Sequence, residues 1–342
     1  MIRTLQSLRF VFVMLVVISH YNDAHFDFGG DCGVSFFFIL SGFVLSLAYS
    51  DKISEGNFCS WSLLKRQWKK VYPLHIMTFL VMVLFDMRLG YHHSISALIA
   101  NMLLMQSWIP SKEVYFMANG PSWFLCDIIF FYVVFSKLNH TLMKAGKKAI
   151  IVLYSIIITC YAFLMLTIPS ELINPVLYVC PLVRLLDFSF GILLYRAYSS
   201  KLGIRLRQQA ISHLSATQST IIESFSVLTV IIIAFAYPFI PQRMATVSLF
   251  WIVIPVFILC FSISDKGKGL LSRFLQSRQM LWLGGLSFEI YLLHMPLLRI
   301  QNSLWNSLQL EQDTILHIFV FILLLILSSH SVKMASHIFR KK

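Results

Sequence analysis

Two ionisable residues stand at the ends of an apolar run near the N-terminus. In LRFVFVMLVVISH (8–20), ten uncharged and nearly all apolar residues separate Arg9 from His20. A histidine changes charge near neutral pH, so His20 could serve as a base, an acid or a nucleophile. If the run is a helix, the two side chains lie about 16 Å apart along its axis, at about 1.5 Å per residue. His20 could equally be structural, and Arg9 could simply extend to a nearby membrane surface.

The polar loop after this run offers partners for the imidazole. It reads YNDAHFDFGGDCG (21–33) and contains three aspartates and a further histidine. A carboxylate such as Asp23 could turn back and orient His20, as acidic side chains do for many catalytic histidines. Imidazole and carboxylate groups also suit zinc or manganese, but their spacing here fits no compact ligand motif. We therefore expect no metal.

The composition indicates which elements must position these residues. The 342 residues are 58% hydrophobic and only 13% charged, whereas soluble domains contain about 25% charged residues. Apolar segments recur along the chain, and several reach the roughly 20 residues that cross a bilayer as a helix. We predict an all-α, polytopic membrane bundle that forms one domain over residues 1–342. Its ten spans would lie at 5–21, 33–50, 71–88, 121–137, 149–168, 177–196, 221–240, 246–263, 280–298 and 314–332.

The distribution of positive charge supports this count. A further apolar stretch, SISALIANMLLMQSWIP (94–110), is short and could be a re-entrant or surface helix. If it does not cross and both termini are cytoplasmic, 22 of the 28 Lys and Arg residues fall on the cytoplasmic side, as the positive-inside rule requires. The net charge of +13 is then mainly a topology signal with some attraction to anionic lipid, and we expect no nucleic-acid partner.

Several ionisable side chains fall inside the predicted spans, where each is costly unless it faces a protein interior or a wet cavity. Arg184 and Asp187 are three residues apart on one helix and could neutralise each other. They could also belong to an ion path. The other candidates are Asp127 and Glu289, with His75 and His294 less deep in their spans.

A basic segment, KRQWKKVYPLH (65–75), precedes the third predicted span. On a helix its cations at i, i+1, i+4 and i+5 share one face. They could be an ordinary cytoplasmic flank with aromatic anchors at Trp68 and Tyr72. They could also clamp the diphosphate of a nucleotide-bearing donor; that binding set is Arg66, Lys69, Lys70 and Tyr72.

Taken in order, these motifs resemble those of the acyltransferase family 3 membrane proteins, which O-acylate surface glycans. Arg9, ten residues and His20 match the motif of that family's first span. GVSFFFILSGFVLS (33–46), which contains Ser41, is similar to its second span, and the basic segment corresponds to one that usually ends in RIYP. NMLLMQSWIP (101–110) and NGPSWFLCDIIFFY (119–132) follow, the latter with Trp123.

Two further segments extend the resemblance to residue 298. They are RLLDFSFGILL (184–194) and LGGLSFEIYLLHMPLL (283–298), and the second contains Ser287, Glu289, Tyr291 and His294. The chain also departs from the family. The arginine of RIYP is Lys70, which keeps the charge but loses the bidentate fork. Two glutamates found in many members fall on Ile128 and Ile129, and the usual tyrosine after Ser287 is Phe288.

The resemblance implies acyl transfer across a bacterial inner membrane. Acyl-CoA, expected to be acetyl-CoA, would bind from the cytoplasm with its phosphates on the basic segment. Its thioester would reach His20, which would either accept the acyl group or deprotonate a sugar hydroxyl of an extracytoplasmic glycan. Arg9 would neutralise a phosphate or hold the donor arm, and Ser41 could hydrogen-bond to the site. The alternatives are a proton- or ion-coupled transporter and a glycan polymerase or flippase that uses no CoA. The oligomeric state is not predicted.

Overall fold

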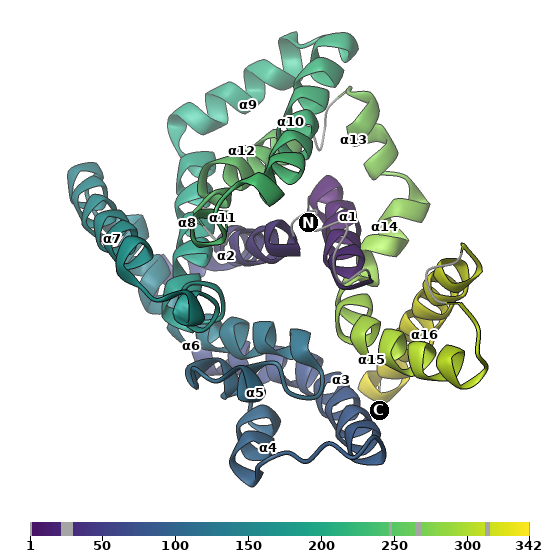
Figure 1. The fold of residues 1–342 in the computed structure, drawn as a ribbon. Helices are drawn as coiled ribbons and strands as arrows, with labels where there is room; N and C mark the ends of the chain where they lie inside the picture. Colours follow the sequence, from purple (N-terminus) through teal and green to yellow (C-terminus); the bar gives the residue numbers. More distant parts are fainter. Residues whose placement is uncertain (1, 22–29, 246–247, 264–267, 312–314, 342) are drawn as a thin grey trace.

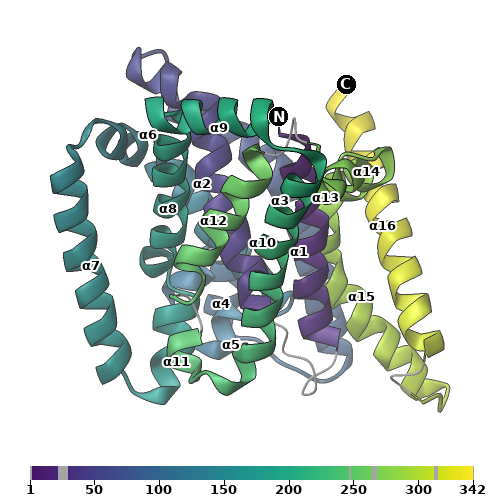
Figure 2. The ribbon, with the colours of Figure 1, turned by 90° about the horizontal axis from the view of Figure 1, so that it is seen from above.

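The protein is all-helical over the residues that its computed structural model describes, which are 2–21, 30–245, 248–263, 268–311 and 315–341. In these ranges every regular element is an α, 3₁₀ or π helix. Figure 2 shows the long helices running side by side as a bundle. The prediction of an all-α, polytopic membrane bundle is confirmed.

Each of the ten predicted spans coincides with a helix or a bent pair of helices. Among the described residues, seven helices are long and apolar enough to cross a membrane, two bent pairs qualify if each is one span, and α12 is shorter. The seven are α1 (Arg3–Tyr21), α2 (Gly30–Ser54), α3 (Ser60–Arg88), α6 (Trp123–Lys144), α7 (Lys147–Thr167), α10 (Ala216–Ala236) and α16 (Ile315–Lys341).

The remaining three predicted spans fall on the two bent pairs and the short helix. The π helix Ile173–Tyr178 meets α8 (Pro181–Ser199) at 45°, and α14 (Arg278–Gly285) meets α15 (Ser287–Ser307) at 59°. A proline begins α8, where the missing N–H costs no helical hydrogen bond. The short apolar helix is α12 (Phe250–Ile263), with 14 residues.

Short helices lie at the two ends of the bundle. Helices α9 (Lys201–His213), α13 (Leu270–Leu275) and α14 lie at the end where α1 begins and α16 finishes, which we call the basic end (Figure 2). Helices α4 (Ile95–Met102), α5 (Lys112–Tyr115) and α11 (Gln242–Ala245) lie toward the opposite end. With eight residues, α4 is about 12 Å long and cannot span a bilayer. The stretch 94–110 is therefore a short helix followed by a 3₁₀ turn, not an additional span.

Helix α2 packs between α8 and α1 (Figure 1). A Cβ added to Gly191 of α8 would overlap the Ile39 carbonyl oxygen of α2, and one added to Gly42 would overlap the Phe188 carbonyl oxygen of α8. The two backbones are therefore in contact, as small residues allow between membrane helices. On its other face, α2 packs Gly33 against Phe12 and Val16 of α1. These contacts fix α1, which carries both Arg9 and His20.

We expect Gly191→Ala to lower the free energy of unfolding by about 1–3 kcal/mol, because the added methyl group overpacks a backbone contact. Thermal unfolding of the detergent-purified protein measures the change. Gly146→Ala is the matched control, since nothing lies within 4 Å of a Cβ built there. Equal melting temperatures for the two variants would contradict the tight α2–α8 crossing.

Candidate active site

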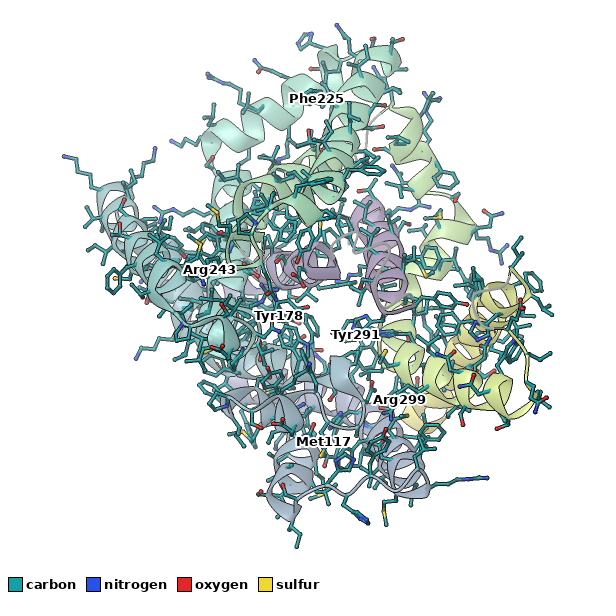
Figure 3. The ribbon with its side chains drawn as sticks, in the orientation of Figure 1. Met117, Tyr178, Phe225, Arg243, Tyr291 and Arg299 are labelled. Carbon is teal, nitrogen blue, oxygen red and sulfur yellow. The ribbon has the colours of Figure 1, made fainter. Side chains whose placement is uncertain are left out.

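Two cavities meet at Tyr291, in the middle of the bundle. The first, which we call the Arg9 cavity, has a volume of about 210 Å³, and its polar lining comprises Arg9, Ser41, Gln67, Lys70, Tyr132, Ser287 and Tyr291. The second, the His20 cavity, has about 750 Å³ and is lined by His20, Asp31, Lys112, Trp123, Tyr178, Tyr291 and Arg299, among others. Figure 3 places Tyr178 and Tyr291 near the centre of the molecule when it is seen along the helices.

Tyr291 is held where the two cavities adjoin. Its hydroxyl donates to the Pro121 carbonyl oxygen at 3.0 Å, and its side chain is 5% exposed. The ring of Phe124 lies 5.2 Å from it and that of Phe37 lies 6.5 Å away, centroid to centroid. The three rings come from α15, α6 and α2, so the boundary between the cavities is formed by helices that are distant in sequence.

His20 is half-buried and lines the larger cavity. Its Nδ1 lies 2.7 Å from the Val16 carbonyl oxygen, one turn earlier on α1. A carbonyl oxygen only accepts, so Nδ1 carries the proton and Nε2 carries the lone pair of the neutral ring. The helix backbone thus selects the tautomer with a basic Nε2. Asp23, predicted as a possible orienting carboxylate, lies outside the described residues.

A second histidine, His294 of α15, packs against His20. The two ring centroids are 5.1 Å apart in an edge-to-face arrangement. His294 is fully buried, and its Nδ1 donates to the Tyr291 carbonyl oxygen at 2.6 Å. Its Nε2 has no hydrogen-bond partner among the described residues. The structure thus places the His20 ring in contact with the ring of His294, which lies 274 positions further along the chain.

Arg9 lines the smaller cavity, on the side of the basic end. No ion pair involving Arg9 occurs among the described residues, and Tyr132 is a polar neighbour at the same cavity. A guanidinium without a carboxylate partner can bind an anionic ligand. Ser41 and Ser287 contribute hydroxyl groups to the same wall.

Only one face of α3 reaches this cavity. Gln67, Lys70 and Val71 line it, one helical turn apart. Arg66 instead donates to the Tyr49 hydroxyl and covers its ring, whereas Lys69 is exposed. The ring of Tyr72 stacks on Trp68 with centroids 4.5 Å apart. Of the four residues predicted to bind the cofactor, the structure therefore brings Lys70 into the cavity and leaves Arg66, Lys69 and Tyr72 outside it.

Arg184 and Asp187 form an ion pair inside the protein. Nη1 of Arg184 lies 3.1 Å from Oδ2 of Asp187, and both side chains are fully buried. Trp251 donates its indole N–H to Asp187 Oδ1 at 2.6 Å, and Ser35 donates to Oδ2 at 3.3 Å. The Arg184 guanidinium also lies over the Phe38 ring at 5.0 Å. Neither residue lines either cavity, as the interpretation of a purely structural pair predicts.

The other predicted polar residues divide between the cavities and the packed interior. Trp123 lines the His20 cavity and packs on Tyr178, with centroids 4.9 Å apart. Asp127 is fully buried on α6, and neither of its carboxyl oxygens accepts a hydrogen bond within the described chain. Glu289 is half-buried near the start of α15 and lines neither cavity.

Comparison of the sequence with known proteins identifies the family. The sequence model of the acyltransferase 3 family, described as an acyltransferase domain, matches residues 2–332. The chain belongs to the acyltransferase 3 family. It is 27% identical to the acyltransferase MdmB of Streptomyces mycarofaciens over 297 residues, which are 81% of this chain and 70% of that protein. Protein 2 in the picA locus of Rhizobium radiobacter is 35% identical over 83 residues, 23% of this chain and 42% of its own. No solved structure matches significantly.

In this acyltransferase, two further charged residues line the His20 cavity: Asp31, one of the loop aspartates considered as partners for His20, and Arg299, which the sequence motifs missed. Asp31 accepts a hydrogen bond from the Tyr237 hydroxyl. Arg299 donates to Asp86 at 2.5 Å and to the Ala118 carbonyl oxygen at 3.2 Å. Asp31 lies in the first turn of α2 and Arg299 lies within α15, so only tertiary packing brings Arg299 to this cavity. Within the described residues, no group of three or more His, Cys, Asp or Glu side chains could hold a metal ion.

Proposed function

We propose that this membrane acyltransferase moves an acetyl group from cytosolic acetyl-CoA to a sugar hydroxyl of a glycan on the outer side of the bacterial inner membrane. One observation carries the proposal. Arg9 and His20, on the same helix, line different cavities, and these cavities share Tyr291. A donor can therefore enter from the basic end while an acceptor approaches from the opposite end.

The Arg9 cavity suits the donor. Arg9 and Lys70 supply positive charge, and phosphate groups bind strongly to such cations. Apolar side chains, including Val44, Leu45 and Phe124, form much of the remaining wall. The uncharged pantetheine arm of CoA matches that lining, and its thioester would lie nearest Tyr291.

The His20 cavity suits the acceptor. Nε2 of His20 takes the proton of a sugar hydroxyl as its oxygen attacks the thioester carbonyl carbon. The carbon–sulfur bond breaks, and the CoA thiolate then takes the proton from the imidazolium. In the second route Nε2 attacks the thioester carbonyl carbon and the carbon–sulfur bond breaks, which gives an acyl-imidazolium and the CoA thiolate. The sugar oxygen then takes the acyl group from Nε2, and the hydroxyl proton passes to the thiolate. Both routes use the same lone pair.

The transporter alternative loses its main support. It required Arg184, Asp187 and Glu289 to serve an ion path, but none of the three lines either cavity. Arg184 and Asp187 also form a hydrogen-bonded ion pair. Radiolabelled acetyl-CoA and an envelope glycan extract, added to the purified protein in liposomes, test the proposal. We expect labelled glycan together with release of CoA thiol. Absence of transfer from acetyl-CoA and from longer acyl-CoAs would refute it.

Arg9→Gln should lower kcat/KM for acetyl-CoA about 10- to 100-fold, mainly by raising KM, because one charge-assisted contact with the donor is lost. CoA-thiol release at varied acetyl-CoA concentrations measures this. Lys147→Gln is the control, since that exposed lysine begins α7 and lies outside both cavities. An unchanged KM in Arg9→Gln would separate Arg9 from donor binding.

A further inference from the structure

A groove lies between α9, α10 and α12, apart from the two central cavities. It consists of two adjoining cavities of about 250 and 230 Å³ that share Ile211 of α9 and Ile263 of α12. We call it the α9 groove. Figure 1 shows these three helices together on one side of the molecule.

One end of the α9 groove is cationic. Arg207 lines it beside Gln208, and its guanidinium lies over the Tyr198 ring at 3.7 Å. Its Nε is buried and has no hydrogen-bond partner within the described chain, and no ion pair there involves Arg207. Helix α9 contains no acidic residue. The Arg207 guanidinium is thus positioned by an aromatic ring without being neutralised.

The other end is apolar and runs further along the spans. Val256, Leu259 and Ile222 line it. Val256 precedes Ile263 by seven residues, about 10 Å along α12, and α12 ends with Ile263 toward the basic end. The groove therefore passes from a cation at the level of the helix ends to an apolar wall about 10 Å further toward the middle of the spans.

The flank of the groove faces outward. On α10 the described buried residues are Ser219 and Glu223 alone, whereas Phe225 and Ile221 are more than half exposed. Figure 3 shows Phe225 at the periphery of the molecule. Helix α9 lies across the ends of the spans, with Leu202 and Leu206 exposed (Figure 2). An exposed apolar surface of this kind on a membrane protein contacts lipid.

We propose that the α9 groove binds one anionic phospholipid of the cytoplasmic leaflet. The phosphate lies on Arg207, and an acyl chain follows Ile211 and Ile263 toward Val256. A phospholipid has an anionic phosphate at one end and acyl chains at the other. The groove has a cation at the end near the helix termini and an apolar wall further along the spans, so the two match in order. Basic residues at the cytoplasmic membrane surface favour anionic lipids in general. Arg207 differs from its exposed neighbour Arg205 because only Arg207 lines the groove.

Non-denaturing mass spectrometry of the detergent-purified protein tests the proposal with phosphatidylglycerol and phosphatidylcholine of matched chain length. We expect about tenfold tighter binding of phosphatidylglycerol. Arg207→Gln should remove this preference, whereas Arg205→Gln, with the same loss of charge outside the groove, should keep it. Cys260→Phe, which fills the apolar end, should weaken the binding of both lipids.

Glycerol 3-phosphate distinguishes a lipid site from a simple anion site, because it has the phosphate without the chains. It should not displace bound phosphatidylglycerol. Retention of the lipid preference in Arg207→Gln, or displacement by glycerol 3-phosphate, would overturn the proposal. Melting temperatures of the variants measured without added lipid show whether each one is folded.

Discussion

His20→Ala should lower the rate of acyl transfer about 10²- to 10⁴-fold, the usual contribution of a positioned acid–base group. The variant keeps the Arg9 cavity and so should still bind acetyl-CoA. Its effect should therefore fall on kcat, with little change in KM for the donor. Initial rates of CoA-thiol release and of glycan labelling, measured in the same liposomes, check both parts.

The control for this experiment is His140→Ala, because His140 is an exposed histidine at the basic end of α6. It should transfer at the wild-type rate. Incubation with labelled acetyl-CoA and no acceptor distinguishes the two chemical routes, since only a nucleophilic His20 leaves the label on the protein. Wild-type transfer by His20→Ala would remove the imidazole from the mechanism while leaving the family membership unchanged.

Asp187→Ala should lower the free energy of unfolding by about 3–5 kcal/mol, because it leaves the Arg184 charge buried without its partner. Asp187 is fully buried, and its carboxylate also accepts the hydrogen bond from Trp251. Replacing both members of the pair with Arg184→Met and Asp187→Leu should recover much of the loss, since no isolated charge remains. Thermal unfolding in detergent measures all three proteins.

Asp51→Ala provides the comparison for this pair, because Asp51 is an exposed aspartate near the end of α2. Its melting temperature should stay close to that of the wild type. If Asp187→Ala had the same melting temperature as Asp51→Ala and yet lost activity, the pair would take part in the chemistry, and the assignment of a structural role to it would be wrong.

Much of the fold follows from the sequence because the bilayer restricts the choice so strongly. The lengths of apolar runs and the asymmetry of Lys and Arg predicted the spans and the short helix within 94–110. Local backbone geometry was harder to predict from the sequence. The surface helix α9 lies in a segment where hydropathy gives no clear signal, and the bend between α14 and α15 falls inside the apolar run 280–298, whose hydropathy does not indicate a bend. The contact of Gly42 with Gly191 depends on two spans meeting, which one-dimensional patterns do not record.

The site was predicted in part. The spacing of Arg9 and His20 indicated two separate positions on one helix, and the structure places them in two cavities. The basic segment predicted four donor contacts, but only Lys70 lines the cavity, one turn after Gln67, because the Arg66 side chain is held by Tyr49 and Lys69 is exposed. Lys112 and Arg299 were missed because only tertiary packing brings them to His20, whereas Asp31 belongs to the polar loop that was expected to supply a carboxylate.

The position of Tyr291 has a consequence for the energised membrane in which we place this enzyme. A transferase with substrates on both sides must avoid a continuous file of water, through which protons would leak and dissipate the gradient. Tyr291 lines both cavities and is held by Phe37, Phe124 and the Pro121 carbonyl oxygen, so its ring is the group that would close that route at rest. An acyl-bearing arm that displaced the ring would itself fill the opening, so the bundle would remain tight to ions throughout turnover.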